Sequence, residues 1–168
     1  MGKLMGASVK RVEDLRFITG KGQYTDDITL PGMTFATIVR SPFAHANIKN
    51  IDFSAAKNAP GYVASFVGGD IPEAIAGVPC GWQVDFKNGD TMKEPPHPLL
   101  ARGKARHVGD AVAVVVAETQ AQAKDAAALV DVEYEELPAV VNISAALKDC
   151  APQLHEGCLL YTSDAADE

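Results

Sequence analysis

AVAVVVAETQAQAKDAAALVDVEYEEL, at residues 111–137, carries the clearest structural signal of the chain. Its first seven residues are continuously apolar, a pattern typical of a strand whose two faces are both buried. Thr119 and Gln122 follow at the spacing of a capping box, which predicts that a helix begins just after Thr119. Small apolar residues recur along one narrow face of this helix and favour close packing on a sheet. The stretch ends with Val and Tyr alternating with acids, which predicts a half-exposed strand.

Further strands are predicted upstream of this unit. They are rich in β-branched and aromatic residues, are bounded by turn residues, and cover residues 33–40, 47–53 and 62–67. Ser54 is expected to cap a short helix that ends before the Pro-Gly pair at 60–61. One more helical turn is predicted over residues 144–147. The predicted fold class is therefore α+β, a mixed β-sheet with a few short helices.

The sequence also predicts how the chain is divided. Residues 1–32 are rich in Gly and charge and show no sustained period, so an extended N-terminal arm is expected there. Residues 33–157 are expected to form the folded domain, with a loop-rich insertion at residues 68–105 that holds much of the Gly and Pro. An Asn-Gly pair at 88–89 is suited to a tight hairpin turn within residues 81–92.

The last residues, CLLYTSDAADE at positions 158–168, resemble the translation of a transposon-type sequencing adapter. We therefore expect this tail to be a read-through artefact; the alternative is a genuine polar tail. If the tail is an artefact, the sequence is the N-terminal piece of a longer protein, and an active site is expected to lie in the missing part.

Composition narrows the classes of function. Of the 168 residues, 47% are hydrophobic, and 22 acids against 15 bases give a net charge of −7. A negative chain offers no broad positive field to nucleic acid or anionic lipid, so a small molecule or a protein is the expected partner. No apolar run approaches the roughly 18 residues of a membrane span. Three scattered cysteines form neither a disulfide framework nor a metal knuckle, so a cytoplasmic location is predicted.

Motifs for nucleotide, metal or nucleophilic chemistry are weak. The Gly-Lys-Gly motif at residues 20–22 lacks the preceding strand and following helix of a phosphate-binding loop. The histidines are too widely spaced to share a helix face, and His45 is interpreted as a ring that satisfies loop backbone groups. Cys80 is a candidate reactive thiol, although a buried, inert cysteine is commoner. Glu133 and Glu135 fall on the outer face of their strand and predict a solvated edge.

A longer ordered pattern is more informative. Its segments are RVEDLRFITGKGQYTDD (11–27), LPGM (30–33), VRSPFAHANIKNID (39–52), APG (59–61), VGDAVAVVVAET (108–119), AKDAAALVDVEYEELPAVV (123–141) and APQLHEG (151–157). In this order they resemble the start of the molybdenum hydroxylase large subunit, in the family of xanthine dehydrogenase, aldehyde oxidase and aerobic carbon monoxide dehydrogenase. The opening arm is most similar to the carbon monoxide dehydrogenase-type subunit.

The resemblance implies a truncated N-terminal α/β hammerhead domain of an oxidoreductase. The intact enzyme is expected to oxidise its substrate at a molybdenum centre, with a molybdopterin-type cofactor in the intact chain and with 2Fe-2S clusters and FAD in partner subunits or domains. In that family the pterin-binding segments and the catalytic glutamate lie downstream of the hammerhead domain. The resemblance therefore assigns no catalytic, cofactor-binding or metal-binding residue to this fragment, which is predicted to be inactive alone.

The N-terminal arm is the predicted contact with a partner subunit. Arg11, Arg16, Phe17 and Tyr24 combine cations with large apolar groups and show no period that would bury them in this domain. Arginine and aromatic residues are enriched at protein interfaces. The alternative is that Phe17 and Tyr24 cover one end of the sheet. For the whole chain, the rival hypothesis is a free-standing, non-catalytic interaction or assembly module of the same fold.

Overall fold

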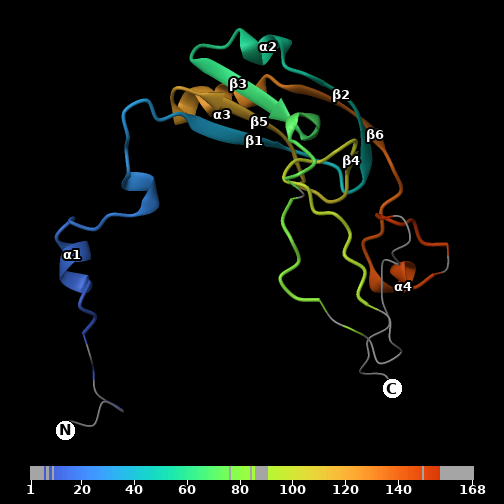
Figure 1. Cartoon of the computed structure of the whole chain (residues 1–168), viewed down its shortest axis with the longest axis horizontal. Coiled ribbons are helices and arrows are strands. Elements are labelled where there is room, and N and C mark those ends of the chain that lie inside the picture. The colour runs from blue at the N-terminus through green and yellow to red at the C-terminus, as the bar shows by residue number, and fades with distance from the viewer. Residues whose placement is uncertain are drawn as a thin grey trace. The chain divides into compact units, whose positions relative to one another are not determined.

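The computed structural model describes residues 6, 8, 10–75, 77–83, 85, 91–148 and 150–155. The chain divides into two compact units, Met1–Met33 and Thr34–Glu168. In the first unit a short helix, α1 (Asp14–Ile18), is followed by a 3-10 turn, η1 (Thr25–Asp27), neither of which the sequence analysis predicted. The second unit holds the strands and the remaining helices (Figure 1).

The described strands of the second unit form two three-stranded sheets. The first sheet has the order β1 (Phe35–Arg40), β5 (Ala111–Ala117), β3 (Tyr62–Val67). The second has the order β4 (Lys104–Ala105), β2 (Ala46–Asp52), β6 (Asp131–Glu136). The helices are α2 (Ser54–Lys57), α3 (Gln120–Ala128) and α4 (Ile143–Ala146). All four of these strand pairings are antiparallel, and this architecture confirms the predicted α+β class.

The core lies between the first sheet and α3. Ala113, Val115 and Ala117 of β5 are fully buried, and they share one face because side chains alternate along a strand. Helix α3 packs against β5 and β1. On this helix Ala123 and Ala126 are also fully buried. Small side chains on both elements let the helix backbone approach the sheet closely, as the sequence predicted.

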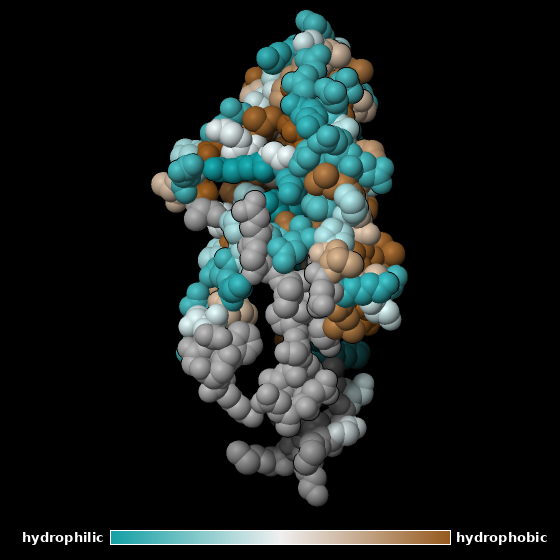
Figure 2. All heavy atoms as spheres, turned by 90° about the vertical axis from the view of Figure 1, so that its right-hand side faces the viewer, coloured by the Kyte–Doolittle hydropathy of each residue, from teal (hydrophilic) through white to brown (hydrophobic). Residues whose placement is uncertain are grey.

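The opposite face of β5 is less well covered. Val112 is fully buried at one end of the strand, whereas Val114 and Val116 are only half-buried. The prediction that both faces of 111–117 are buried is therefore wrong for the middle of the strand. In the view of Figure 2, hydrophobic residues are interspersed with hydrophilic ones on the surface of the molecule.

Polar side chains cap the start of α3 and of α4, but not of α2. Thr119 is the N-cap of α3, and its hydroxyl accepts a hydrogen bond from the backbone N–H of Gln122 at 3.2 Å. Ser54 lies instead in the first turn of α2, where its N–H and hydroxyl both donate to the Asp52 carboxylate. The predicted Ser54 cap is thus wrong, because a nearby carboxylate is the stronger acceptor. Helix α4 begins after Asn142, whose side-chain oxygen accepts a backbone N–H at 2.8 Å.

The insertion at residues 68–105 has little regular structure among its described residues. A 3-10 turn, η2 (Gly68–Asp70), opens it, and an isolated antiparallel bridge joins Asp85 to Thr91. The Asn-Gly turn predicted at 88–89 lies outside the described residues. Within the described ranges, no helix has the length and apolar character needed to cross a membrane.

Candidate functional site

Three of the four predicted interface residues meet in the N-terminal unit. The rings of Phe17 and Tyr24 stack with their centroids 5.6 Å apart and their planes 13° from parallel. The Arg16 guanidinium lies over the Phe17 ring, 5.2 Å from its centroid. Arg11 stays apart from this stack and pairs with Asp14 at 3.3 Å. We call the set formed by Arg16, Phe17 and Tyr24 the arm cluster.

Two glycines shape the arm cluster. Gly20 has a φ of +69°, the left-handed conformation that commonly follows the end of a helix. At Gly22, a Cβ atom would lie 2.5 Å from a ring carbon of Phe17, so only glycine lets the chain pass this close to the ring. The motif at residues 20–22 therefore serves the aromatic stack. From the sequence alone this motif is only a weak phosphate-binding signal, and its role beside the Phe17 ring is not predicted.

The segment that holds the arm cluster carries large apolar side chains that are open to solvent. Val12 is 97% exposed, Ile18 is 81% exposed and Tyr24 is 65% exposed. No residue of α1 is buried. Exposed apolar groups close together on a short segment commonly mark a surface that another protein covers.

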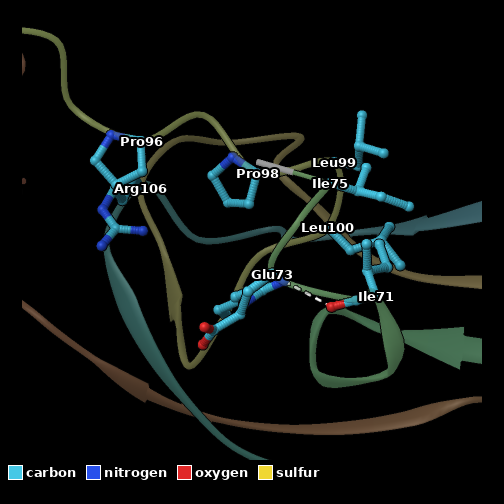
Figure 3. Close-up of a pocket in the computed structure, with 9 residues that line it drawn as sticks. Ile71, Glu73, Ile75, Pro96, Pro98, Leu99, Leu100 and Arg106 are labelled. Atoms are coloured by element: carbon cyan, nitrogen blue, oxygen red, sulfur yellow. Dashed lines mark hydrogen bonds between the residues drawn. The ribbon is translucent and has the colours of Figure 1, made fainter. Parts of the chain in front are cut away.

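A shallow pocket of about 180 Å³ lies between the loop after β3 and the loop that leads to β4 (Figure 3). It is lined by Ile71, Glu73, Ile75, Pro96, Pro98, Leu99, Leu100, Arg102 and Arg106. Arg102 donates to the Ile71 carbonyl at 2.8 Å, and Arg106 donates through Nε to the Leu154 carbonyl at 3.0 Å. Both guanidinium groups thus tie loop segments together, which gives them a structural use in this pocket.

Cys80 lies in a second loop pocket and is exposed, so the interpretation of it as a buried cysteine is wrong. Its thiol donates to the Trp82 carbonyl at 2.9 Å. The Glu94 carboxylate accepts the Cys80 N–H at 2.7 Å and the Gln83 side-chain amide at 3.1 Å. These hydrogen bonds, with that from the Cys80 N–H first, lower the pKa of Glu94. Glu94 therefore links its own segment of the loop to the segment that contains Cys80 and Gln83.

His45 fulfils its predicted backbone-binding role. It is only 5% exposed, and its Nδ1 lies 2.8 Å from the carbonyl oxygen of Pro138. Because a carbonyl can only accept, Nδ1 is the donor of this hydrogen bond. Within the described chain, His45 Nε2 and the Tyr134 hydroxyl are buried without a hydrogen-bond partner. Burial raises the pKa of Tyr134, whose ring packs against Phe43 with centroids 5.2 Å apart.

The acidic strand β6 presents its carboxylates to solvent. Glu135 accepts hydrogen bonds from Lys49 Nζ at 2.7 Å and from Asn47 Nδ2 at 2.8 Å, and its side chain remains 52% exposed. These bonds, first of all the one from Lys49, lower the pKa of Glu135. Glu133 is also exposed. The predicted solvated edge is confirmed.

The described ranges contain no group of three or more His, Cys, Asp and Glu side chains arranged to hold a metal ion. We assign no catalytic step to the described residues. The described residues form an α+β fold, preceded in the chain by a segment that carries a cation–aromatic cluster.

Comparison with known proteins gives the family. Residues 19–138 match the family described as aldehyde oxidase and xanthine dehydrogenase, a/b hammerhead domain. The chain belongs to this family, which confirms the predicted resemblance. The xanthine dehydrogenase molybdenum-binding subunit of Escherichia coli O157:H7 is 41% identical over 150 residues, covering 88% of this chain and 19% of that subunit. The carbon monoxide dehydrogenase large chain of Afipia carboxidovorans is 42% identical over 153 residues, covering 90% and 18%.

Solved structures show the same fold. Quinoline 2-oxidoreductase from Pseudomonas putida 86 superposes with a TM-score of 0.73 at 46% identity, over 85% of this chain and 18% of that chain. The copper- and molybdenum-containing CO dehydrogenase, in its carbon monoxide reduced state, gives a TM-score of 0.71 at 41% identity, over 88% and 17%. The chain thus spans less than a fifth of the length of the relatives that it matches.

Proposed function

We propose that this chain is the N-terminal structural and interface domain of the large subunit of a molybdenum-dependent hydroxylase or dehydrogenase of the carbon monoxide dehydrogenase type. One observation carries the proposal: about nine-tenths of the chain aligns at 41% and 42% identity with a molybdenum-binding subunit and a carbon monoxide dehydrogenase large chain. In this proposal the chain supplies scaffold and contact surface, and it is inactive on its own.

Substrate oxidation belongs to other parts of the proposed enzyme. A molybdopterin-type cofactor, held by the rest of the large subunit, would supply the oxidising centre, and 2Fe-2S clusters and FAD in partner subunits or domains would carry electrons away. The described cysteines Cys80 and Cys150 are both free, which supports placing the enzyme in the reducing cytoplasm.

We assign the domains as the sequence predicted them: an arm at residues 1–32, the hammerhead domain at residues 33–157 with its insertion at 68–105, and a read-through tail at 158–168. The division of the chain between Met33 and Thr34 supports the boundary of the arm. The tail lies outside the described residues, so its assignment rests on its sequence alone.

The arm is proposed to dock a partner subunit through the arm cluster and Arg11. An arginine over a stacked aromatic pair offers a flat apolar surface with a fixed positive charge beside it. Such groups are frequent hot spots because they bury much area and lose little conformational freedom on binding. The exposure of Val12 and Ile18 on the same segment of the chain supports a surface that is completed by another chain.

The docking test uses the full-length large subunit expressed with its partner subunits. The triple variant Arg11→Ala, Arg16→Ala, Phe17→Ala is compared with the control Lys10→Ala, Lys21→Ala, which removes the same sign of charge from the arm. Weakened co-purification of the partners with an unchanged melting temperature of the lone large subunit supports docking. Unchanged co-purification with a lowered melting temperature would show that the arm is ordinary core packing.

The sequence of the gene downstream of residue 157 separates the two hypotheses for the whole chain. An open reading frame of several hundred further residues, and molybdenum in the purified product, support the oxidoreductase. An early stop codon would identify a free-standing module of the same fold.

A further inference from the structure

The first sheet has a less covered face with two rows of apolar residues. In one row across the sheet, Ile38 of β1 pairs with Val114 of β5, which pairs with Phe66 of β3. The neighbouring row on the same face consists of Ala36, Val116 and Ala64. Ile38 and Phe66 remain 43% and 45% exposed. We call these six residues the open face.

The reverse side of the same sheet shows what a covered face looks like in this protein. Its rows are Thr37, Val115 and Ser65, and Val39, Ala113 and Val67. Every one of these residues is buried or half-buried, and none is exposed. Helix α3, which packs on β1 and β5, accounts for this difference. The sheet thus has one covered face and one open face.

The composition of β5 points to a missing cover. Strand β6, which is half-exposed, alternates Val132 and Tyr134 with the exposed acids Glu133 and Glu135. Strand β5 reads AVAVVVA and contains no polar residue on either face. That composition is typical of strands that are buried on both sides. The sequence of β5 therefore fits an environment in which the open face is also covered.

We propose that the open face is the docking surface for the part of the large subunit that follows the hammerhead domain. The inference rests on the proposed function. In the relatives, the stretch matched by this chain is only 19% and 18% of the subunit, so most of each large subunit lies outside it. The covering segment is apolar where it touches the sheet, because the open face offers no charge or hydrogen-bonding side chain.

The size of the open face favours a tethered segment over a separate chain. A stable association between free proteins buries on the order of 800 Å² on each partner, which is more than six partly covered side chains supply. A segment of the same polypeptide needs no such area, because the covalent link gives it a high effective concentration at the sheet. A second copy of the chain is therefore the less suitable occupant.

Thiol labelling of the 168-residue chain and of the full-length large subunit tests the inference. Cys80 and Cys150 are replaced by Ser in both proteins, and Cys158 of the tail is replaced in the 168-residue chain. In this background Phe66→Cys reports on the open face and Val115→Cys reports on the covered face. Maleimide labelling is followed by mass spectrometry of the peptide that carries each substitution, and each rate is divided by that of the urea-unfolded protein.

Phe66→Cys is expected to label quickly in the 168-residue chain and on the order of 100-fold more slowly in the full-length subunit, while Val115→Cys is slow in both. Fast labelling of Phe66→Cys in both proteins would overturn the inference. Slow labelling already in a dimeric 168-residue chain would also overturn it, in favour of a second copy.

Metal analysis of the same full-length protein tests the proposed function separately. If the full-length protein contains molybdenum but Phe66→Cys is labelled quickly, the docking surface is refuted and the proposed function is not. If Phe66→Cys is protected from labelling but the full-length protein contains no molybdenum, the oxidoreductase is refuted and the docking surface is not.

Discussion

Truncating two neighbouring valines of β5 should cost very different amounts of stability. Val115 is fully buried in the core, with 0% of its surface in solvent, whereas Val114 is half-buried on the open face. Val→Ala removes two methyl groups, worth about 0.8 kcal/mol each when buried. At Val115 the cavity left behind adds to this loss, for a total of about 2–3 kcal/mol. At Val114 roughly half of the transfer energy is lost and no closed cavity forms, so the cost is about 1 kcal/mol or less.

The measurement is urea unfolding of the 168-residue chain, followed by far-UV circular dichroism, with the free energy taken from midpoints at a constant slope. For a chain of this size, 1 kcal/mol corresponds to a shift of about 2–4 °C in melting temperature, so a thermal scan gives a second reading. The two substitutions are matched in chemistry, strand and sequence neighbourhood, and they differ only in the face they occupy. Equal losses for Val114→Ala and Val115→Ala would refute the assignment of a covered and an open face.

Two other perturbations test local features. Gly22→Ala places a methyl group against the aromatic stack and should weaken the near-UV circular dichroism of the arm. The control is Gly69→Ala, whose added carbon has no atom within 4 Å and which should leave that signal unchanged. Equal spectra for the two variants would show that the stack tolerates the methyl group. Lys49→Gln should raise the pKa of Glu135 toward its usual range in an NMR titration, with Lys124→Gln as the control. Because the folded-state pKa of Glu135 is lowered, its contribution to stability is present above the unfolded-state pKa and is lost as pH falls through the folded-state pKa. An unchanged titration curve in Lys49→Gln would contradict the assigned cause.

The strands were the most predictable part of the fold. Strands 62–67 and 111–117 begin and end where the sequence predicted, because Pro, Gly and charged residues interrupt the apolar runs at both ends. The N-cap of α3 at Thr119 was also predictable, since a capping hydroxyl acts within one turn of the chain. Such features depend on residues that are close together in the chain, so they can be predicted from a single sequence.

Pairing and burial could not be predicted in the same way. Strands β5 and β6 are joined by α3, yet they lie in different sheets, because pairing depends on residues far away in sequence. The Ser54 cap failed because the Ser54 hydroxyl donates to the Asp52 carboxylate instead of accepting a backbone N–H of the helix. In the arm, the aromatic residues were predicted as a site, but their stacking depends on Gly22, which contributes by having no side chain. The exposure of Cys80 follows from a loop that Glu94 closes, and no periodic pattern reports it.

The open face also bears on the two hypotheses for the whole chain. A free-standing module would be selected to solvate every sheet face that it does not cover, as β6 does with Glu133 and Glu135. An apolar face left open in such a module would promote association of unrelated molecules, so polar residues would be favoured on it. The two rows of the open face, which contain Ile38 and Phe66, carry none. A domain that is buried within a larger subunit has no such constraint, and for this reason the uninterrupted apolar sequence of β5 favours the large-subunit hypothesis over the module.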